Sequence, residues 1–224
     1  MTAIADNWRA IRARVDAACE RAGRSPDDVT IVAVSKFHPI SAIREAIAAG
    51  ARDFGENYAQ ELAAKQHELD GDTRWHFIGR LQRNKAKLVA GKVALVHAVD
   101  SIELAAELGK RAGDHPQAVL LAVNLANEAT KGGVTAETAA ALANAIAAES
   151  NVALAGLMTM PPPELDPRPL FDQLRDLRDR IADALGAALP VLSMGMSGDF
   201  ETAIACGATH VRIGTAIFGE RPPG

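Results

Sequence analysis

The chain has 224 residues, of which 48% are hydrophobic and 23% are charged, and its formal net charge is −4. These proportions are ordinary for a soluble globular protein, and the mild acidity gives no support to a nucleic-acid or membrane partner. No apolar run reaches the roughly 20 residues that a membrane span needs, and the N-terminus lacks a signal-peptide core. Its 2 cysteines stand in no metal-binding spacing. We therefore expect no metal site, no disulfide framework and a cytoplasmic location.

An amphipathic helix is expected at the start of the chain. Ile4, Trp8, Ile11 and Val15 recur at helical spacing, which predicts a helix over residues 4–21. This helix precedes the first predicted strand.

Eight short apolar runs follow, separated by alanine-rich amphipathic stretches. The predicted strands cover residues 30–36, 52–57, 74–79, 94–100, 118–124, 154–160, 191–196 and 210–215, with the last running on to 219. The predicted helices between them include residues 41–49, 58–68, 102–111, 136–148 and 171–184.

Strands that alternate with helices indicate a parallel sheet. Eight such units in a chain of this length predict an α/β fold, a single TIM-type (β/α)8 barrel over residues 1–224 with an extra N-terminal helix. An open doubly wound sheet is the competing architecture. The lack of a GxGxxG motif after the first predicted strand weighs against it.

Lys36 stands at the end of the first predicted strand, the edge of a barrel that carries the active sites of barrel enzymes. Partial desolvation there would favour the neutral amine, which Schiff-base chemistry with a carbonyl requires. A strand-end lysine can equally pack its stem on the rim and keep its ammonium in water. Lys36 alone therefore leaves both interpretations open.

The turns after the seventh and eighth predicted strands both suit a phosphate group. Ser197 and Asp199 have the character of helix caps, and Gly198 between them would let a ligand approach the backbone. Gly214 and Thr215 add a second glycine and a second hydroxyl. These two loops form the usual phosphate site of the fold, with plain capping as the alternative.

Arg212 lies inside an apolar strand, where an arginine is rare unless paired. It either pairs with a carboxylate such as Asp199 or Glu56, or faces a ring nitrogen or an anion. His76, on the third predicted strand, is more commonly a hydrogen-bonded core residue than a catalyst.

Four more residues near strand ends have ordinary structural explanations. Asn57 and Asn124 can satisfy backbone groups at the rim, whereas Met158 and Met160 are expected to fill the core. Lys131 is expected to be a solvated loop lysine. The residues together predict a barrel in which a phosphorylated aldehyde would bridge Lys36 and the two phosphate-binding turns after the seventh and eighth strands.

Matching stretches at nearly every strand–helix junction carry a family resemblance. They cover residues 33–36, 54–58, 75–82, 128–132, 156–160, 192–197 and 211–219. With them the chain resembles the pyridoxal phosphate homeostasis protein family, which binds pyridoxal 5'-phosphate (PLP) and shares the alanine racemase N-terminal barrel fold. The sequence departs from the commoner family pattern at Phe37 and His38, which affects the mouth of the site.

The resemblance implies a role for each candidate site residue. Lys36 would carry the Schiff base with PLP, and Arg212 would face the pyridine nitrogen. The phosphate would be held by Ser197, Gly198, Gly214 and Thr215, while Asn57, His76 and Met158 would lie beside the ring. No residue is assigned a catalytic role.

The resemblance also implies a function in PLP homeostasis, namely binding, buffering and delivery of the cofactor without substantial turnover. PLP-dependent apoenzymes would be transient recipients. Alanine racemases carry a second domain with a catalytic tyrosine, whereas the single tyrosine here, Tyr58, follows the second predicted strand. We therefore expect a non-catalytic monomer. A small PLP-dependent racemase or lyase, and a barrel for another phosphate ester such as an aldolase substrate, are the alternatives.

Overall fold

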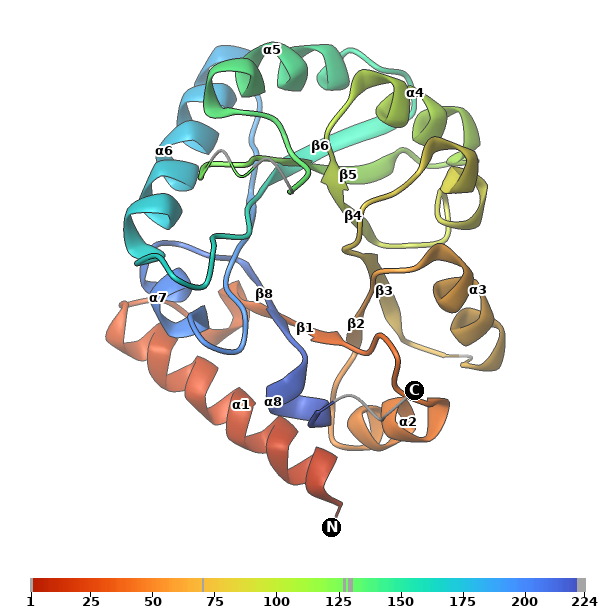
Figure 1. Cartoon of the computed structure of the whole chain (residues 1–224), viewed down its shortest axis with the longest axis vertical. Helices are drawn as coiled ribbons and strands as arrows, with labels where there is room; N and C mark the ends of the chain where they lie inside the picture. Colours follow the sequence, from red (N-terminus) through yellow and green to blue (C-terminus); the bar gives the residue numbers. More distant parts are fainter. Residues whose placement is uncertain (1, 70, 127, 129–130, 221–224) are drawn as a thin grey trace.

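The computed structural model describes residues 2–69, 71–126, 128 and 131–220. Within this part of the chain, eight parallel strands close into a barrel in sequence order, and β8 pairs with β1 (Figure 1). Helix α1 (Ala3–Arg21) precedes β1 and packs outside the barrel against α2, α7 and α8. The predicted TIM-type barrel with an additional N-terminal helix is confirmed.

The strands are β1 (Thr30–Val34), β2 (Asp53–Glu56), β3 (Arg74–Phe77), β4 (Leu95–Val99), β5 (Gln117–Ala122), β6 (Val152–Met158), β7 (Val191–Ser193) and β8 (His210–Ile213). The further helices are α2 (Ile40–Ala48), α3 (Ala59–Glu68), α4 (Ile102–Arg111), α5 (Ala136–Ala147), α6 (Arg168–Leu185), α7 (Phe200–Ala205) and α8 (Thr215–Phe218). Two short 3₁₀ helices are η1 (Pro26–Asp28) and η2 (Arg83–Leu88).

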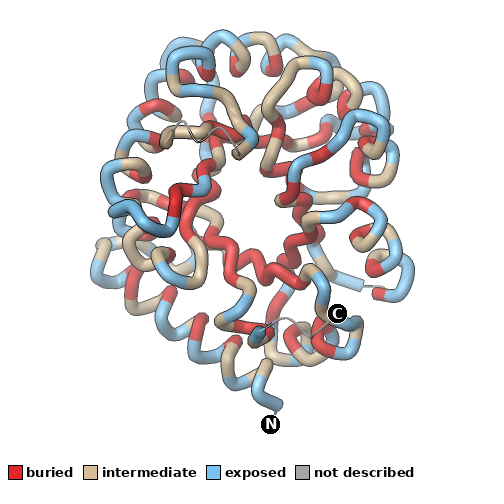
Figure 2. Tube along the Cα trace, viewed as in Figure 1, coloured by how far each residue is buried: buried red, intermediate tan, exposed pale blue. Residues whose placement is uncertain are grey.

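The buried residues gather on the strands and on the inner faces of the helices around them (Figure 2). In α1, for example, Trp8, Ile11 and Val15 are buried, as their helical spacing predicts. Most strand residues are buried, because helices cover one face of the sheet and side chains fill the other. None of the helices formed by the described residues is long and apolar enough to cross a membrane.

The eighth strand ends at Ile213, so the prediction that it runs on to residue 219 is wrong. Beyond Gly214 the chain does not continue as a strand but forms helix α8, in which the N–H of Phe218 bonds the carbonyl of Gly214 at 3.0 Å. Ile217 and Phe218 are buried there, next to α1. A short apolar run suits a buried helix as well as a buried strand, so the pattern alone could not separate them.

Candidate functional site

Three neighbouring strands bring the predicted phosphate and amine residues to one edge of the barrel. Strand β8 pairs with both β7 and β1, so the turns after these strands adjoin. The hydroxyl of Thr215 donates to that of Ser197 at 3.4 Å, across 18 residues of sequence. Lys36 follows β1 on the same edge and is half-buried.

The two adjoining turns after β7 and β8 carry backbone N–H groups that make no hydrogen bond within the described residues. They are the N–H groups of Ser197, Gly198, Thr215 and Ala216. A Cβ built on Gly198 would meet no atom within 4 Å, so the space beside this turn is open. Free N–H groups beside two hydroxyls suit a phosphate.

Asp199 does not cap α7 with its side chain, contrary to expectation. Its carboxylate instead accepts a 2.6 Å hydrogen bond from the N–H of Met196, which closes the turn. The predicted cap at Ser197 is also absent among the described residues, because that hydroxyl bonds Thr215. The Asp199 side chain therefore bonds its own loop, whereas the Ser197 hydroxyl bonds the neighbouring turn after β8.

Lys36 lies in a tight turn that begins at Ser35, whose carbonyl accepts from the N–H of His38 at 3.0 Å. Phe37 has a φ of 67°, a left-handed conformation that a bulky residue adopts only when its surroundings enforce it. Its ring packs against Tyr58 at 5.3 Å between centroids. Phe37 and His38 thus lie in the same turn as Lys36.

A buried polar cluster behind the sheet holds this turn. Lys65, on α3, donates three 2.7 Å hydrogen bonds, to the carbonyl of Ser35 and to carboxylate oxygens of Glu56 and Glu61. Glu61 also accepts from the N–H of Phe37 at 2.6 Å, and Glu56 accepts from the Ser35 hydroxyl at 2.7 Å. Backbone and side-chain bonds on both sides of the lysine therefore fix its position.

Glu56 is fully buried, and its second carboxylate oxygen has no partner among the described residues. Burial raises the pKa of Glu56, although the bonds from Lys65 and Ser35 favour its charged form. Lys65 was not among the residues predicted from the sequence. Its spacing of four residues from Glu61 on a helix was the available signal.

Arg212 is 7% exposed and points into the barrel. It donates to the hydroxyl of Ser193 at 2.6 Å and to the carbonyl of Thr159 at 2.9 Å. The alternative that it pairs with Asp199 or Glu56 is wrong, since neither carboxylate bonds it. Burial lowers the pKa of Arg212 to about 10, with the charge of Asp199 opposing, so it stays a cation at neutral pH.

His76 lies in the barrel interior and is 3% exposed, in line with a hydrogen-bonded core histidine. Its Nε2 lies 3.0 Å from Asp53 and its Nδ1 lies 3.0 Å from Nε2 of His97. Both ring nitrogens thus have partners inside the protein. That His76 lies beside the ring of bound PLP stays a prediction.

Asn57 and Met158 line two different cavities at the rim. Asn57 borders a cavity of about 900 Å³ after β2, β3 and β4, where Gly79 lies against it so closely that a Cβ would come 2.2 Å from the Asn57 carbonyl oxygen. Met158 borders a cavity of about 270 Å³ together with Lys131. Met160 borders the second cavity but is 45% exposed, so its prediction as core filler is wrong.

The loop after β5 is internally bonded. Asn124 exchanges hydrogen bonds with both backbone groups of Glu128, at 2.8 and 3.1 Å, which confirms that it satisfies the rim backbone. Lys131 is not simply solvated, because its ammonium lies 2.6 Å from the Glu128 carboxylate.

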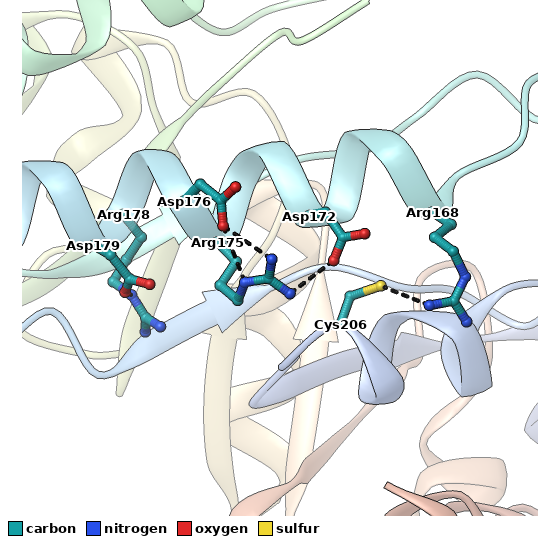
Figure 3. A network of polar contacts seen from close by, with 7 residues as sticks. All are labelled: Arg168, Asp172, Arg175, Asp176, Arg178, Asp179 and Cys206. Carbon is teal, nitrogen blue, oxygen red and sulfur yellow. Dashed lines mark hydrogen bonds and ion pairs between the residues drawn. The ribbon is translucent and has the colours of Figure 1, made fainter.

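Neither cysteine offers a reactive thiol. Cys206 is buried beneath the charged face of α6, where Arg168 donates to its sulfur at 3.9 Å (Figure 3). Burial raises the pKa of Cys206 to about 11 and also raises the pKa of Cys19. Both thiols are therefore protonated at neutral pH.

Comparisons with known proteins show to which family the chain is similar. The family model described as alanine racemase, N-terminal domain, matches residues 1–222. The pyridoxal phosphate homeostasis protein of Aquifex aeolicus is 49% identical over 93% of this chain and 94% of its own length. That of Pseudomonas aeruginosa is 46% identical over 100% of this chain and 98% of its own length.

Solved structures show the same similarity. PipY of Synechococcus elongatus PCC7942, with PLP bound, superposes with a TM-score of 0.85 at 37% identity, covering 96% of this chain and 100% of PipY. An alanine racemase from Corynebacterium glutamicum has a TM-score of 0.73 at 20% identity, over 97% of this chain and 61% of the racemase. The second match shows the shared barrel fold alone.

Proposed function

The chain belongs to the pyridoxal phosphate homeostasis protein family, built on the alanine racemase N-terminal barrel, and we propose that it binds PLP at the edge formed by β7, β8 and β1. The observation that carries the proposal is that backbone N–H groups and two hydroxyls in adjoining turns lie on the same edge as an amine that follows the adjoining strand. A PLP-bound relative of the same fold, which aligns over 96% of this chain, supports it.

The proposed site divides into an amine, a phosphate cradle and a ring environment. The aldehyde of PLP would form a Schiff base with Lys36, whose turn is held rigidly by Lys65. The residues that bind the phosphate are Ser197, Gly198, Gly214 and Thr215. Those that surround the ring are Arg212, Asn57, His76 and Met158.

Arg212 would direct a cationic donor toward the pyridine nitrogen. An acceptor facing a permanent cation stays unprotonated, which makes the cofactor a poorer electron sink. That property favours storage over reaction. We propose accordingly that the protein binds, buffers and delivers PLP to apoenzymes without substantial turnover, as a cytoplasmic monomer whose 224 residues form one domain.

The test is the visible absorption spectrum of the purified protein with added PLP, before and after borohydride, for the natural chain and for Lys36→Ala. We expect a band that borohydride abolishes, with the adduct on the Lys36 peptide and no such adduct in the variant. Lys92→Ala, which changes an exposed lysine, is the matched control. An unchanged band in Lys36→Ala would move the attachment to another lysine, and no band at all would favour a different phosphate ester.

Turnover is tested on the same samples. Incubation of the loaded protein with L- and D-alanine or serine should leave the optical activity unchanged. A loss of optical activity that depends on Lys36 would replace the carrier function by a racemase or lyase.

A further inference from the structure

Five buried polar side chains form one hydrogen-bonded chain through the barrel interior. His76 bridges Asp53 and His97, with 3.0 Å between the bonded atoms on either side. His97 Nδ1 lies 2.8 Å from the hydroxyl oxygen of Ser193, which accepts a 2.6 Å bond from Arg212. The five residues come from β2, β3, β4, β7 and β8, and each is at most 7% exposed.

The two ends determine the direction of every bond in this chain when both rings are neutral. Asp53 can only accept, so His76 carries its proton on Nε2 and accepts at Nδ1. His97 must then donate from Nε2, which leaves its Nδ1 to accept the Ser193 hydroxyl hydrogen. At the other end Arg212 only donates, so the Ser193 oxygen accepts from it. Every hydrogen bond in the row is therefore donated in the same direction, from Arg212 toward Asp53.

The charges at the ends agree with this direction. Burial alone would raise the pKa of Asp53, but hydrogen bonds from Arg74 and His76 outweigh it and hold that pKa at about 2. Burial lowers the pKa of His97 well below its usual value, which keeps its ring neutral. His210 packs beside both other histidines, with ring centroids 5.8 and 6.0 Å away, and its pKa is lowered to about 4, chiefly by burial.

This row of hydrogen bonds stabilises the buried guanidinium of Arg212. Among the described residues no carboxylate bonds the guanidinium, although an unpaired buried cation is costly. A line of aligned hydrogen-bond dipoles that ends on an anion stabilises a cation at its other end. The chain therefore links Arg212 to the negative charge of Asp53, which lies at the start of β2.

We propose that Asp53, His76, His97 and Ser193 are a positioning relay for Arg212. They orient the Ser193 hydroxyl to accept from Arg212 and so direct the remaining guanidinium donors to the ligand. This inference rests on the proposed function, because the ligand group that Arg212 faces there is the pyridine nitrogen. Asp53, His97 and Ser193 act on Arg212 through these hydrogen bonds, whereas His76 also belongs to the proposed ring environment.

The first test needs no cofactor. Nitrogen-15 NMR of the histidine side chains in the PLP-free protein should show His76 and His97 each protonated on Nε2 and unprotonated on Nδ1. Asp53→Asn offers an amide donor to His76 and should reverse the protonated nitrogen in both rings. In the natural protein, an imidazolium at His76 or a His97 ring protonated on Nδ1 would overturn the proposed direction of the relay.

The second test is a double-mutant cycle on the affinity for PLP. Ser193→Ala and His97→Asn should each weaken binding about tenfold in the natural background, the loss expected when one buried hydrogen bond is removed. Neither should weaken binding further in an Arg212→Leu background, because the relay acts through Arg212. His67→Gln, at an exposed histidine, is the control.

The outcomes separate the two proposals. Equal losses with and without Arg212 would show a merely structural role for Ser193 and His97 and would overturn the relay. If the natural chain binds no PLP, the proposed function fails, while the NMR experiment still decides the direction of the hydrogen bonds.

Discussion

The ammonium of Lys65 donates a 2.7 Å hydrogen bond to the carbonyl oxygen of Ser35, the residue immediately before Lys36. Replacing Lys65 by methionine should lower the free energy of unfolding by about 3–5 kcal/mol, because the buried Glu56 loses its cation. Urea unfolding measures the change. The double variant Glu56→Gln with Lys65→Met, which removes both charges, should recover part of the loss, and equal instability of the two variants would contradict the ion-pair explanation.

Gly198→Ala and Gly79→Ala should separate binding from folding. A Cβ at Gly198 has open space around it, so the variant should keep its stability but bind PLP more weakly, because the methyl group occupies the side from which the phosphate approaches. A Cβ at Gly79 would collide with the backbone of Asn57 and should destabilise the fold. Thermal unfolding and PLP titration distinguish the two effects. Unaltered PLP affinity in Gly198→Ala would place the phosphate elsewhere.

Thr215→Val should weaken the binding of PLP roughly 10- to 100-fold, the loss expected for one hydrogen bond to a charged group. The substitution keeps the side-chain volume and also removes the hydroxyl that donates to Ser197. Binding of pyridoxal, which lacks the phosphate, should change little. The ratio of the two dissociation constants is the measurement, and a loss that is equal for both ligands would argue against a phosphate contact.

The stability of the protein should fall in mild acid. Burial lowers the pKa of His210 to about 4, and that of His97 falls well below its usual value for the same reason. A histidine with a lowered folded-state pKa contributes full stability above its unfolded pKa of about 6.5, and this stability is lost as the pH falls toward the folded value. For His210 the loss is on the order of 3 kcal/mol.

Asp53 extends the same trend to lower pH. Its pKa of about 2 lies below the unfolded value of about 4, so the stability it contributes disappears between these two values. The raised pKa of Glu56 acts in the opposite direction. Urea unfolding between about pH 7 and pH 4 should show the loss of stability due to the histidines. The dependence of the unfolding free energy on pH should be weaker in His210→Asn. An unchanged slope in that variant would assign the decline to other groups.

Much of the fold was predictable because its signals are local. The helical spacing of Trp8, Ile11 and Val15 and the apolar strands depend only on near neighbours in the sequence. Lys36, Ser197 and Thr215 were identifiable because strand ends of a parallel barrel meet on one edge. Their joint placement followed once eight strand–helix units had been counted.

Other features depended on packing between distant segments. Whether residues 215–218 continue a strand or form a helix was decided by how they pack beside α1. Lys65 contacts Ser35 across 30 residues, and His97 contacts Ser193 across 96. No local pattern encodes such pairs.

The sequence by itself determined the barrel, the family and the residues at the strand ends, because periodicity and short motifs survive without coordinates. Only the tertiary structure decided which polar groups in the interior meet. A buried lysine, two histidines and an arginine acquire their roles from the partners that desolvation forces on them, and those partners come from strands and helices far apart in the chain.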